Sequence, residues 1–131
     1  MTWVELFAVL VVCHLVGDFV LQTNWQATRK RGGLGADRES MRALTSHVAA
    51  YTLTFVPALI WTGDERGAGA AIGLAAVIAG SHLVQDDGRL LARYLRSVKK
   101  LDPREDQLVA VLADQALHAV TLLVAALIVG T

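Results

Sequence analysis

Four long apolar stretches constrain the fold of this chain more than any other feature. They cover residues 3–22, 42–61, 68–86 and 103–129. A helix rises 1.5 Å per residue, so roughly 20 residues cross the ~30 Å hydrocarbon core of a bilayer. Hydrophobic residues make up 54% of the chain, which is typical of a polytopic membrane protein. The sequence therefore predicts an all-α fold, a four-transmembrane-helix bundle that forms a single membrane domain over residues 1–131.

The segments around these stretches carry local structural signals. Glycines and basic residues indicate a flexible polar connection over residues 24–41. Pro57 removes one backbone hydrogen bond and predicts a kink in the second helix. The sequence TGDERG predicts a short loop between the second and third helices. Asp102 and Pro103 fit the cap and the first position of the fourth helix, which we expect over residues 103–129.

Residues 88–101 have the pattern of a basic amphipathic helix. Their leucine, valine and tyrosine side chains follow helical spacing, and their arginines and lysines lie largely on the opposite face. This pattern predicts a helix that lies in the membrane interface and favours anionic lipid. A solvated helix packed on the end of the bundle is the alternative interpretation.

The distribution of basic residues predicts an orientation. Of the 12 Lys and Arg residues, five lie between the first two helices and six between the last two. Only Arg66 lies between the second and third helices. Cytoplasmic loops carry an excess of Lys and Arg, so we expect both strongly basic connections in the cytoplasm. Both termini are then outside.

Histidines and aspartates interrupt all four apolar stretches. Three histidine–aspartate pairs have a spacing of four residues, which places both side chains on one face of a helix. The second stretch carries a lone histidine. The predicted orientation puts all of these residues in the cytoplasmic half of the membrane, at comparable depth. They are predicted to form one site: His14, Asp18, His47, His82, Asp86, Asp114 and His118.

This set of residues favours a metal site. An ionisable group at the centre of a membrane helix costs on the order of 2.5–3.5 kcal/mol, so such groups usually pair or serve a function. Neutral imidazole and carboxylate are ligands for Zn, Mn or Fe. Seven candidates suit one ion with supporting residues, or two ions that share a carboxylate. An interhelical hydrogen-bond network that only fixes the packing is the alternative.

The motifs also resemble a known family. HLVGDFVLQTNW, a lone histidine in the second helix, HLVQDD and DQALH together resemble a small bacterial family of integral membrane proteins of unknown function. More remotely, the pattern is similar to membrane-bound metal-dependent hydrolases. The resemblance implies metal-site roles for the same seven residues and a location in the bacterial inner membrane.

The leading hypothesis for function is a metal-dependent hydrolase that acts on a phospholipid or other amphiphilic phosphoester at the cytoplasmic leaflet. A bound metal supplies hydroxide at neutral pH, and Asp86 or Asp114 can accept the proton. Basic side chains beyond the third helix can hold an anionic headgroup, and amide or phenol groups can orient water. The candidate substrate-binding residues are Arg89, Arg93, Gln22, Tyr51 and Gln115.

Two other functions remain open. The first is a divalent-cation or proton transporter, because His/Asp chains also mark ion paths. The almost purely apolar outer halves of the helices count against conduction by a monomer. The second is a non-catalytic membrane scaffold with a structural metal. We expect membrane lipid as a partner and no nucleic acid, and the small residues of 68–86 offer an interface for a homo-oligomer.

Overall fold

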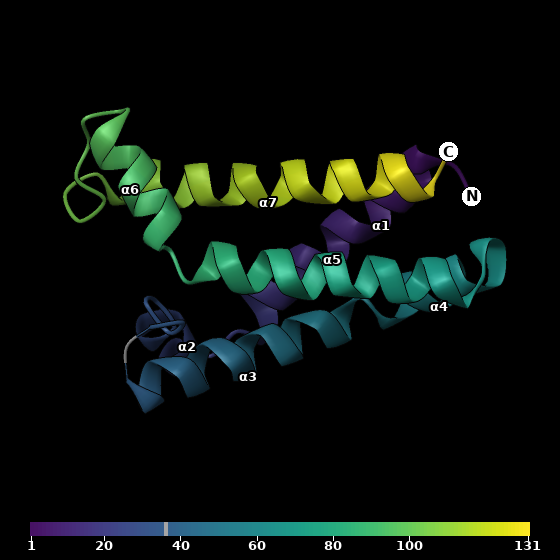
Figure 1. Cartoon of the computed structure of the whole chain (residues 1–131), viewed down its shortest axis with the longest axis horizontal. Coiled ribbons are helices and arrows are strands. Elements are labelled where there is room, and N and C mark those ends of the chain that lie inside the picture. Colours follow the sequence, from purple (N-terminus) through teal and green to yellow (C-terminus); the bar gives the residue numbers. More distant parts are fainter. Residues whose placement is uncertain (36) are drawn as a thin grey trace.

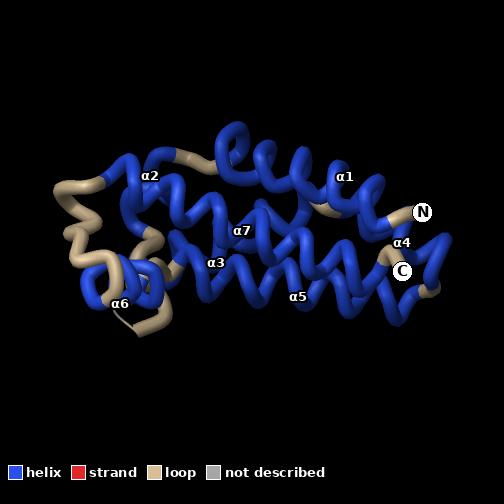
Figure 2. Tube along the Cα trace, turned by 90° about the horizontal axis from the view of Figure 1, so that it is seen from above, coloured by secondary structure: helices blue, strands red, loops and turns tan. Residues whose placement is uncertain are grey.

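The computed structural model describes residues 1–35 and 37–131, and over these residues the fold is entirely helical. The longer helices lie roughly along the long axis, and α6 (Arg89–Ser97) lies across the ends of α5 (Ala68–Asp86) and α7 (Gln107–Val129) (Figure 1). Figure 2 shows α6 nearly end-on, which agrees with this crossing. In chain order the elements are α1 (Trp3–Leu15), the π-helical segment η1 (Val16–Leu21), α2 (Asn24–Arg29), α3 (Arg38–Thr54), α4 (Val56–Arg66), α5 (Ala68–Asp86), α6 (Arg89–Ser97) and α7 (Gln107–Val129).

Three helical segments in the described part of the chain are long and apolar enough to cross a membrane. They are Trp3–Leu21, Ala68–Asp86 and Gln107–Val129. The pair α3 and α4 passes the same test together, but it is bent by 53°. The structure therefore supports three spans, or four if the bent pair is one broken span.

The distribution of side chains is inverted relative to a water-soluble protein. Large apolar residues point outward: Val20 is 71% exposed, Ile72 is 70% exposed and Ile128 is 74% exposed. Histidines on four different helices are buried, with His47 fully so. A soluble monomer rarely exposes so much contiguous apolar surface. The arrangement is that of a protein whose outside faces lipid.

The break between α3 and α4 lies at Phe55, next to the predicted kink residue. Pro57 occupies the first turn of α4, where its missing N–H is tolerated. The predicted kink is confirmed. The prediction that TGDERG forms a loop was wrong, because α4 continues through Arg66. The chain turns at Gly67, where φ is +89°. Only glycine adopts that φ without strain.

Three other predicted boundaries were also wrong. One is the end of the basic amphipathic helix, predicted at residue 101, because α6 ends at Ser97. The predicted flexible connection 24–41 also contains a helix, α2, which begins with a capping box formed by Thr23 and Gln26. The helix α3 begins at Arg38, because the Asp37 carboxylate accepts hydrogen bonds from the backbone N–H groups of Glu39 and Ser40. These bonds, with that of the Ser40 hydroxyl, lower the pKa of Asp37.

The fourth helix starts at Gln107, four residues later than predicted. The Asp102 carbonyl accepts from the backbone N–H groups of Glu105 and Asp106, which closes an isolated turn. Asp106 then leaves helical geometry with ψ of +52°, so Asp102 does not cap α7.

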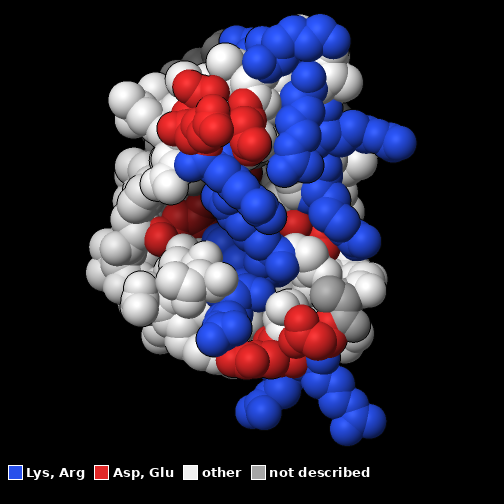
Figure 3. Space-filling model, turned by 90° about the vertical axis from the view of Figure 1, so that its left-hand side faces the viewer, with Lys and Arg blue, Asp and Glu red and all other residues white. Residues whose placement is uncertain are grey.

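The two ends of the molecule differ in charge. The N-terminal ammonium lies 3.2 Å from the Glu65 carboxylate, and Arg66 donates to the carbonyl of Thr131. Both termini and the α4–α5 turn are therefore at one end (Figure 1). Lys and Arg side chains crowd the opposite end, over α2 and α6 (Figure 3).

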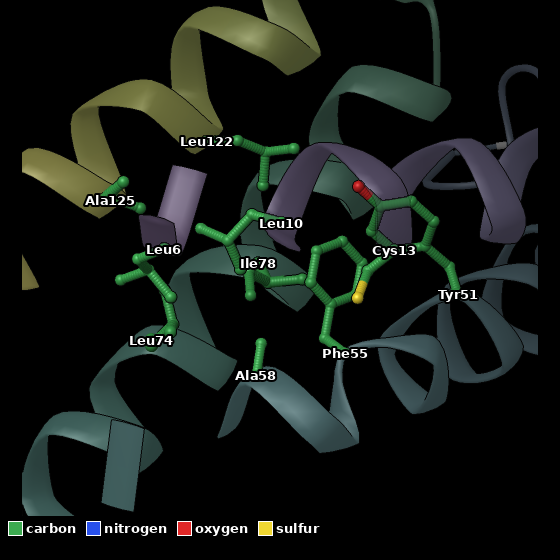
Figure 4. Packing of buried hydrophobic residues seen from close by; sticks show 11 residues of the cluster. Leu6, Leu10, Cys13, Tyr51, Phe55, Ala58, Leu74, Ile78, Leu122 and Ala125 are labelled. Atoms are coloured by element: carbon green, nitrogen blue, oxygen red, sulfur yellow. The ribbon is translucent and has the colours of Figure 1, made fainter. Parts of the chain in front are cut away.

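An apolar cluster fills the bundle near the end that carries the termini. Figure 4 shows it to contain side chains from α1, α3, α4, α5 and α7, with the Tyr51 ring at its border. Leu6, Leu10 and Phe55 are fully buried there. This cluster separates the buried histidines from the end that carries the termini.

Close packing around Gly17 yields a stability prediction. A Cβ added at Gly17 would lie 2.6 Å from Cδ2 of the buried Tyr51 ring. We expect Gly17→Ala to destabilise the detergent-solubilised protein by about 1–3 kcal/mol, the usual cost of overpacking. Unfolding in a denaturing detergent measures the loss. Gly80→Ala is the control, because no atom lies within 4 Å of its added Cβ. Equal stability of the two variants would contradict the packing shown here.

Candidate metal site

Four side chains converge on one buried point between η1, α3 and α5. Nε2 of His47 lies 2.9 Å from Oδ2 of Asp86, 3.2 Å from Oδ1 of Asp18 and 3.0 Å from Nε2 of His82. Nε2 of His82 lies 3.1 Å from the same Asp86 oxygen and 3.4 Å from the same Asp18 oxygen. We call this group the His/Asp cluster: Asp18, His47, His82 and Asp86.

Hydrogen bonds alone do not account for this convergence. A ring nitrogen carries one N–H or one lone pair, so it makes one good hydrogen bond in its plane. Each Nε2 here has three neighbours at 3.4 Å or less within the cluster. Oδ1 of Asp18 and Nδ1 of His82 have no hydrogen-bond partner among the described residues. The contacts therefore outnumber the protons that can bridge them.

A metal ion fits the same four atoms. Ligands at ~2.0–2.1 Å from a tetrahedral ion lie about 3.3 Å from one another. The five separations above, from 2.9 to 3.4 Å, are close to that value. Two imidazole nitrogens and two carboxylate oxygens are also a suitable donor set for Zn, Mn or Fe. The His/Asp cluster could thus hold a metal ion, and its donors do not identify which metal.

The local backbone explains how Asp18 reaches the site. It lies in η1, where the first membrane helix changes from α to π geometry. A π-turn shifts side chains around the helix axis, and such turns are frequent at functional sites. The predicted i,i+4 contact is present, because Nδ1 of His14 lies 3.6 Å from Oδ2 of Asp18. Gly17 allows η1 to pack directly on the Tyr51 ring.

His118 faces the cluster from α7. Its Nδ1 donates to the backbone carbonyl of Asp114 at 2.8 Å, so in the neutral ring Nε2 carries the lone pair. Nε2 is buried without a hydrogen-bond partner in the described chain, and it lies 3.6 Å from Oδ1 of Asp86. Two acceptors that face each other favour a cation between them.

His14 is held by neutral groups. Its Nδ1 lies 3.0 Å from the Tyr51 hydroxyl, and its Nε2 lies 2.9 Å from Oε1 of Gln115. Nε2 of Gln115 in turn donates to Asp18 at 3.5 Å. The Tyr51 ring also stacks on His82 at a centroid distance of 3.4 Å. His14, Tyr51 and Gln115 thus support the cluster through contacts with Asp18 and His82.

The remaining predicted residues lie at different distances from the cluster. The side-chain amide nitrogen of Gln22 lies 3.2 Å from Nδ1 and 2.9 Å from Nε2 of His47. Asp114 lies outside the four-residue group, with a carboxylate oxygen 3.9 Å from Nδ1 of His118. Arg89 pairs with Asp87 at 2.6 Å, and Arg93 lines an open surface pocket on α6. The two arginines are thus at the basic end of the molecule but not in the cluster.

Sequence reasoning missed Lys30. Its Nζ donates to Oδ2 of Asp86 at 2.6 Å, and the side chain is only 12% exposed. The loop that follows α2 folds back on the end of α5, where Gly32 and Leu34 donate backbone N–H bonds to Asp87. The Thr23/Gln26 capping box predicts α2 and hence a helical start to this segment. No local signal predicts the long-range pairing of Lys30 with Asp86.

The fold and the site define a helical protein with candidate membrane spans and a buried His/Asp cluster. The chain belongs to a family described as protein of unknown function (DUF3307), whose model matches residues 6–131. The predicted membership of a family of unknown function is confirmed. No curated protein and no solved structure matches the chain, and no hydrolase family supports the remote resemblance to metal-dependent hydrolases.

The Lys30–Asp86 pair allows a test of the site without knowledge of the reaction. Lys30→Met leaves a buried carboxylate without its ammonium partner, which typically costs about 3–5 kcal/mol. We expect that loss in metal-free protein, measured by thermal or detergent unfolding. A divalent metal at about 100 times its Kd should restore ~2.7 kcal/mol by binding the folded state. Lys99→Met is the control, since Lys99 is exposed. Equal stability of the two variants would contradict the ion pair.

Proposed function

We propose that this protein is a membrane-embedded, metal-dependent hydrolase that acts on a phospholipid or other amphiphilic phosphoester at the cytoplasmic leaflet. The observation that carries the proposal is the His/Asp cluster, four ligand atoms that fit one ion inside an apolar bundle. His118, facing Asp86, supports a second ion at the same carboxylate.

The proposal includes a membrane topology. We take the bent pair α3–α4 as one broken span, so that four spans form one bundle and α6 lies in the membrane interface. The basic end over α2 and α6 then faces the cytoplasm of a bacterial cell, and both termini face outside. The positive-inside rule supports this orientation. The exposed Leu90 and Tyr94 of α6, at 63% and 45%, and Val98 directly after it, at 64%, support contact with lipid.

The proposed chemistry assigns roles to the chain's own residues. A bound divalent ion supplies a Lewis acid and an activated water. Asp18, His47, His82 and Asp86 would hold it. Asp114 has no side-chain hydrogen bond to another described residue and lines the cavity that reaches Asp86, so it is placed to accept a proton. Gln22 and Tyr51 orient His47 and His82, and the apolar cluster excludes water from the terminal side.

Access to the cluster favours an enzyme over a scaffold. A cavity of about 40 Å³, which we call the entrance cavity, reaches Asp86 from the basic end. Its lining includes Lys30, Arg31, Gln85 and Asp114. A structural metal site is normally closed by its four protein ligands, whereas a catalytic site stays reachable. A cavity at the site supports catalysis.

The apolar cluster favours an enzyme over a transporter. A conducting path needs polar groups on both sides of the site. Between the His/Asp cluster and the terminal end lie Leu6, Leu10 and Phe55, all fully buried. This fully buried apolar layer supports access to the His/Asp cluster from the cytoplasmic side alone.

Metal content is the primary test of the proposal. Protein purified without chelator and then offered Zn, Mn or Fe should retain ion at one or two per chain by elemental analysis. His47→Ala and Asp86→Asn should lose the cluster ion, because each removes one of its ligands. Asp64→Asn, at the opposite end, should bind as the wild type does. Wild-type protein that retains no ion under these conditions would refute the metal site.

Hydrolysis and transport are separated by two assays on the same metal-loaded protein. We expect phosphoester cleavage in vesicles of phosphatidylglycerol, with Asp114→Asn lowering kcat about 10²–10⁴-fold, the usual loss of a general base. The ion content of this variant should stay near that of the wild type. Cation flux into sealed vesicles that depends on His82, with no cleavage, would instead support the transporter.

A further inference from the structure

Three openings follow one another along α5 and α7, from the apolar outer surface to the His/Asp cluster. The first part is a groove of about 560 Å³ between α5 and α7, which we call the α5–α7 groove. The lining is apolar except for Thr121, and its valines at 77, 120 and 124 are 47%, 57% and 48% exposed. In a membrane, this groove is open to hydrocarbon.

The groove leads towards a second opening. We call this the Asp114 cavity, about 420 Å³ in volume and lined by α5, α6 and α7. A hydrogen bond of 2.8 Å from Gln85 to Thr121 lies at the junction of the two. Thr121 lines the groove, and Gln85 lines the Asp114 cavity. The two openings therefore follow the same α5–α7 seam.

The second opening meets the metal site. Gln85, Leu91 and Asp114 line both the Asp114 cavity and the entrance cavity, which also contains Asp86. Along this series the lining is apolar in the groove, includes Gln85 and Asp114 in the Asp114 cavity, and includes Lys30 and Arg31 in the entrance cavity. This change of polarity matches an amphiphile that enters chain first along the seam, with its charged end at the cluster.

Resting on the proposed function, we infer that the α5–α7 groove holds one acyl chain of an anionic phospholipid, whose phosphate lies in the entrance cavity. From Ala70 to Gln85 the helix rises about 22 Å, enough to seat a long chain. Lys30 and Arg31 supply the positive charge that a phosphate needs. Oε1 of Gln85, buried without a partner among the described residues, can accept from a headgroup hydroxyl.

This placement changes the anion-binding residues from those the sequence suggested. Arg89 and Arg93 line a pocket on α6 that contains no residue of the His/Asp cluster, whereas Lys30 and Arg31 line the entrance cavity together with Asp86. Lys30 contacts Asp86 directly. Lys30 and Arg31 are therefore better placed than Arg89 and Arg93 to bind a phosphate that reacts at the cluster.

Photo-crosslinking tests the inference. The probe is phosphatidylglycerol with a diazirine on one acyl chain, in vesicles that contain metal-free or metal-loaded protein. Mass spectrometry should find label concentrated on groove residues of α5 and α7. Val77→Trp fills the groove and should lower this labelling at least about fivefold. Ile72→Trp should not, because Ile72 is 70% exposed and does not line the groove. Val124→Trp should repeat the loss from α7.

Each contrary outcome is distinct. Uniform labelling of all lipid-facing residues, or equal labelling of the two α5 variants, would overturn the inference. So would a disulfide between two chains at Val77→Cys in a Cys13→Ala background, since a second copy would then occupy the groove. Elemental analysis of the same samples reports the metal site separately. Protein that retains metal but shows no labelling in the groove would contradict the lipid site alone. Protein that is labelled in the groove but retains no metal would contradict the hydrolase proposal alone.

Discussion

Two buried carboxylates impose the main constraint on this structure. Asp18 and Asp86 expose only 6% and 1% of their side chains, inside a bundle whose outer surface is apolar. Desolvation of each charged carboxylate costs several kcal/mol unless cations or donors surround it. The chain meets this requirement with Lys30, with four histidines and with ligand atoms spaced to hold a divalent ion. The two carboxylates and Lys30 leave one net negative charge, which a divalent ion more than neutralises.

Much of the local irregularity of the fold serves this cluster. The π-helical segment presents Asp18, and Gly17 lets that segment approach Tyr51 closely. Tyr51 stacks on His82 and is hydrogen-bonded to His14, so one aromatic side chain positions histidines from two helices. The loop after α2 folds onto Asp87 and brings Lys30 to Asp86. The π-helical segment and the loop after α2 are thus two departures from regular helix geometry that lie at the charged groups, where packing over-determines them.

The sequence predicted the helical class and the main site because those signals are local. Apolar runs of about 20 residues and i,i+4 His/Asp spacing follow from the geometry of a single helix. The convergence of His47 with His82 could be predicted only through charge topology, which put both at the same depth. Lys30 could not be predicted, because its contact joins residues 56 apart through an irregular loop. The early start assigned to the fourth helix failed because the Asp102 carbonyl closes an isolated turn that ends at Asp106, and cap residues alone do not distinguish such a turn from the first turn of a helix.

X-ray absorption spectroscopy of the metal-loaded protein tests the central claim most directly. The structure predicts a first shell of two imidazole nitrogens and two or more oxygens at ~2.0–2.2 Å, with the outer-shell scattering typical of histidine. His47→Ala should remove part of that imidazole signal while Asp64→Asn leaves the spectrum unchanged. A first shell of oxygen alone, with no histidine scattering and no response to His47→Ala, would contradict the account.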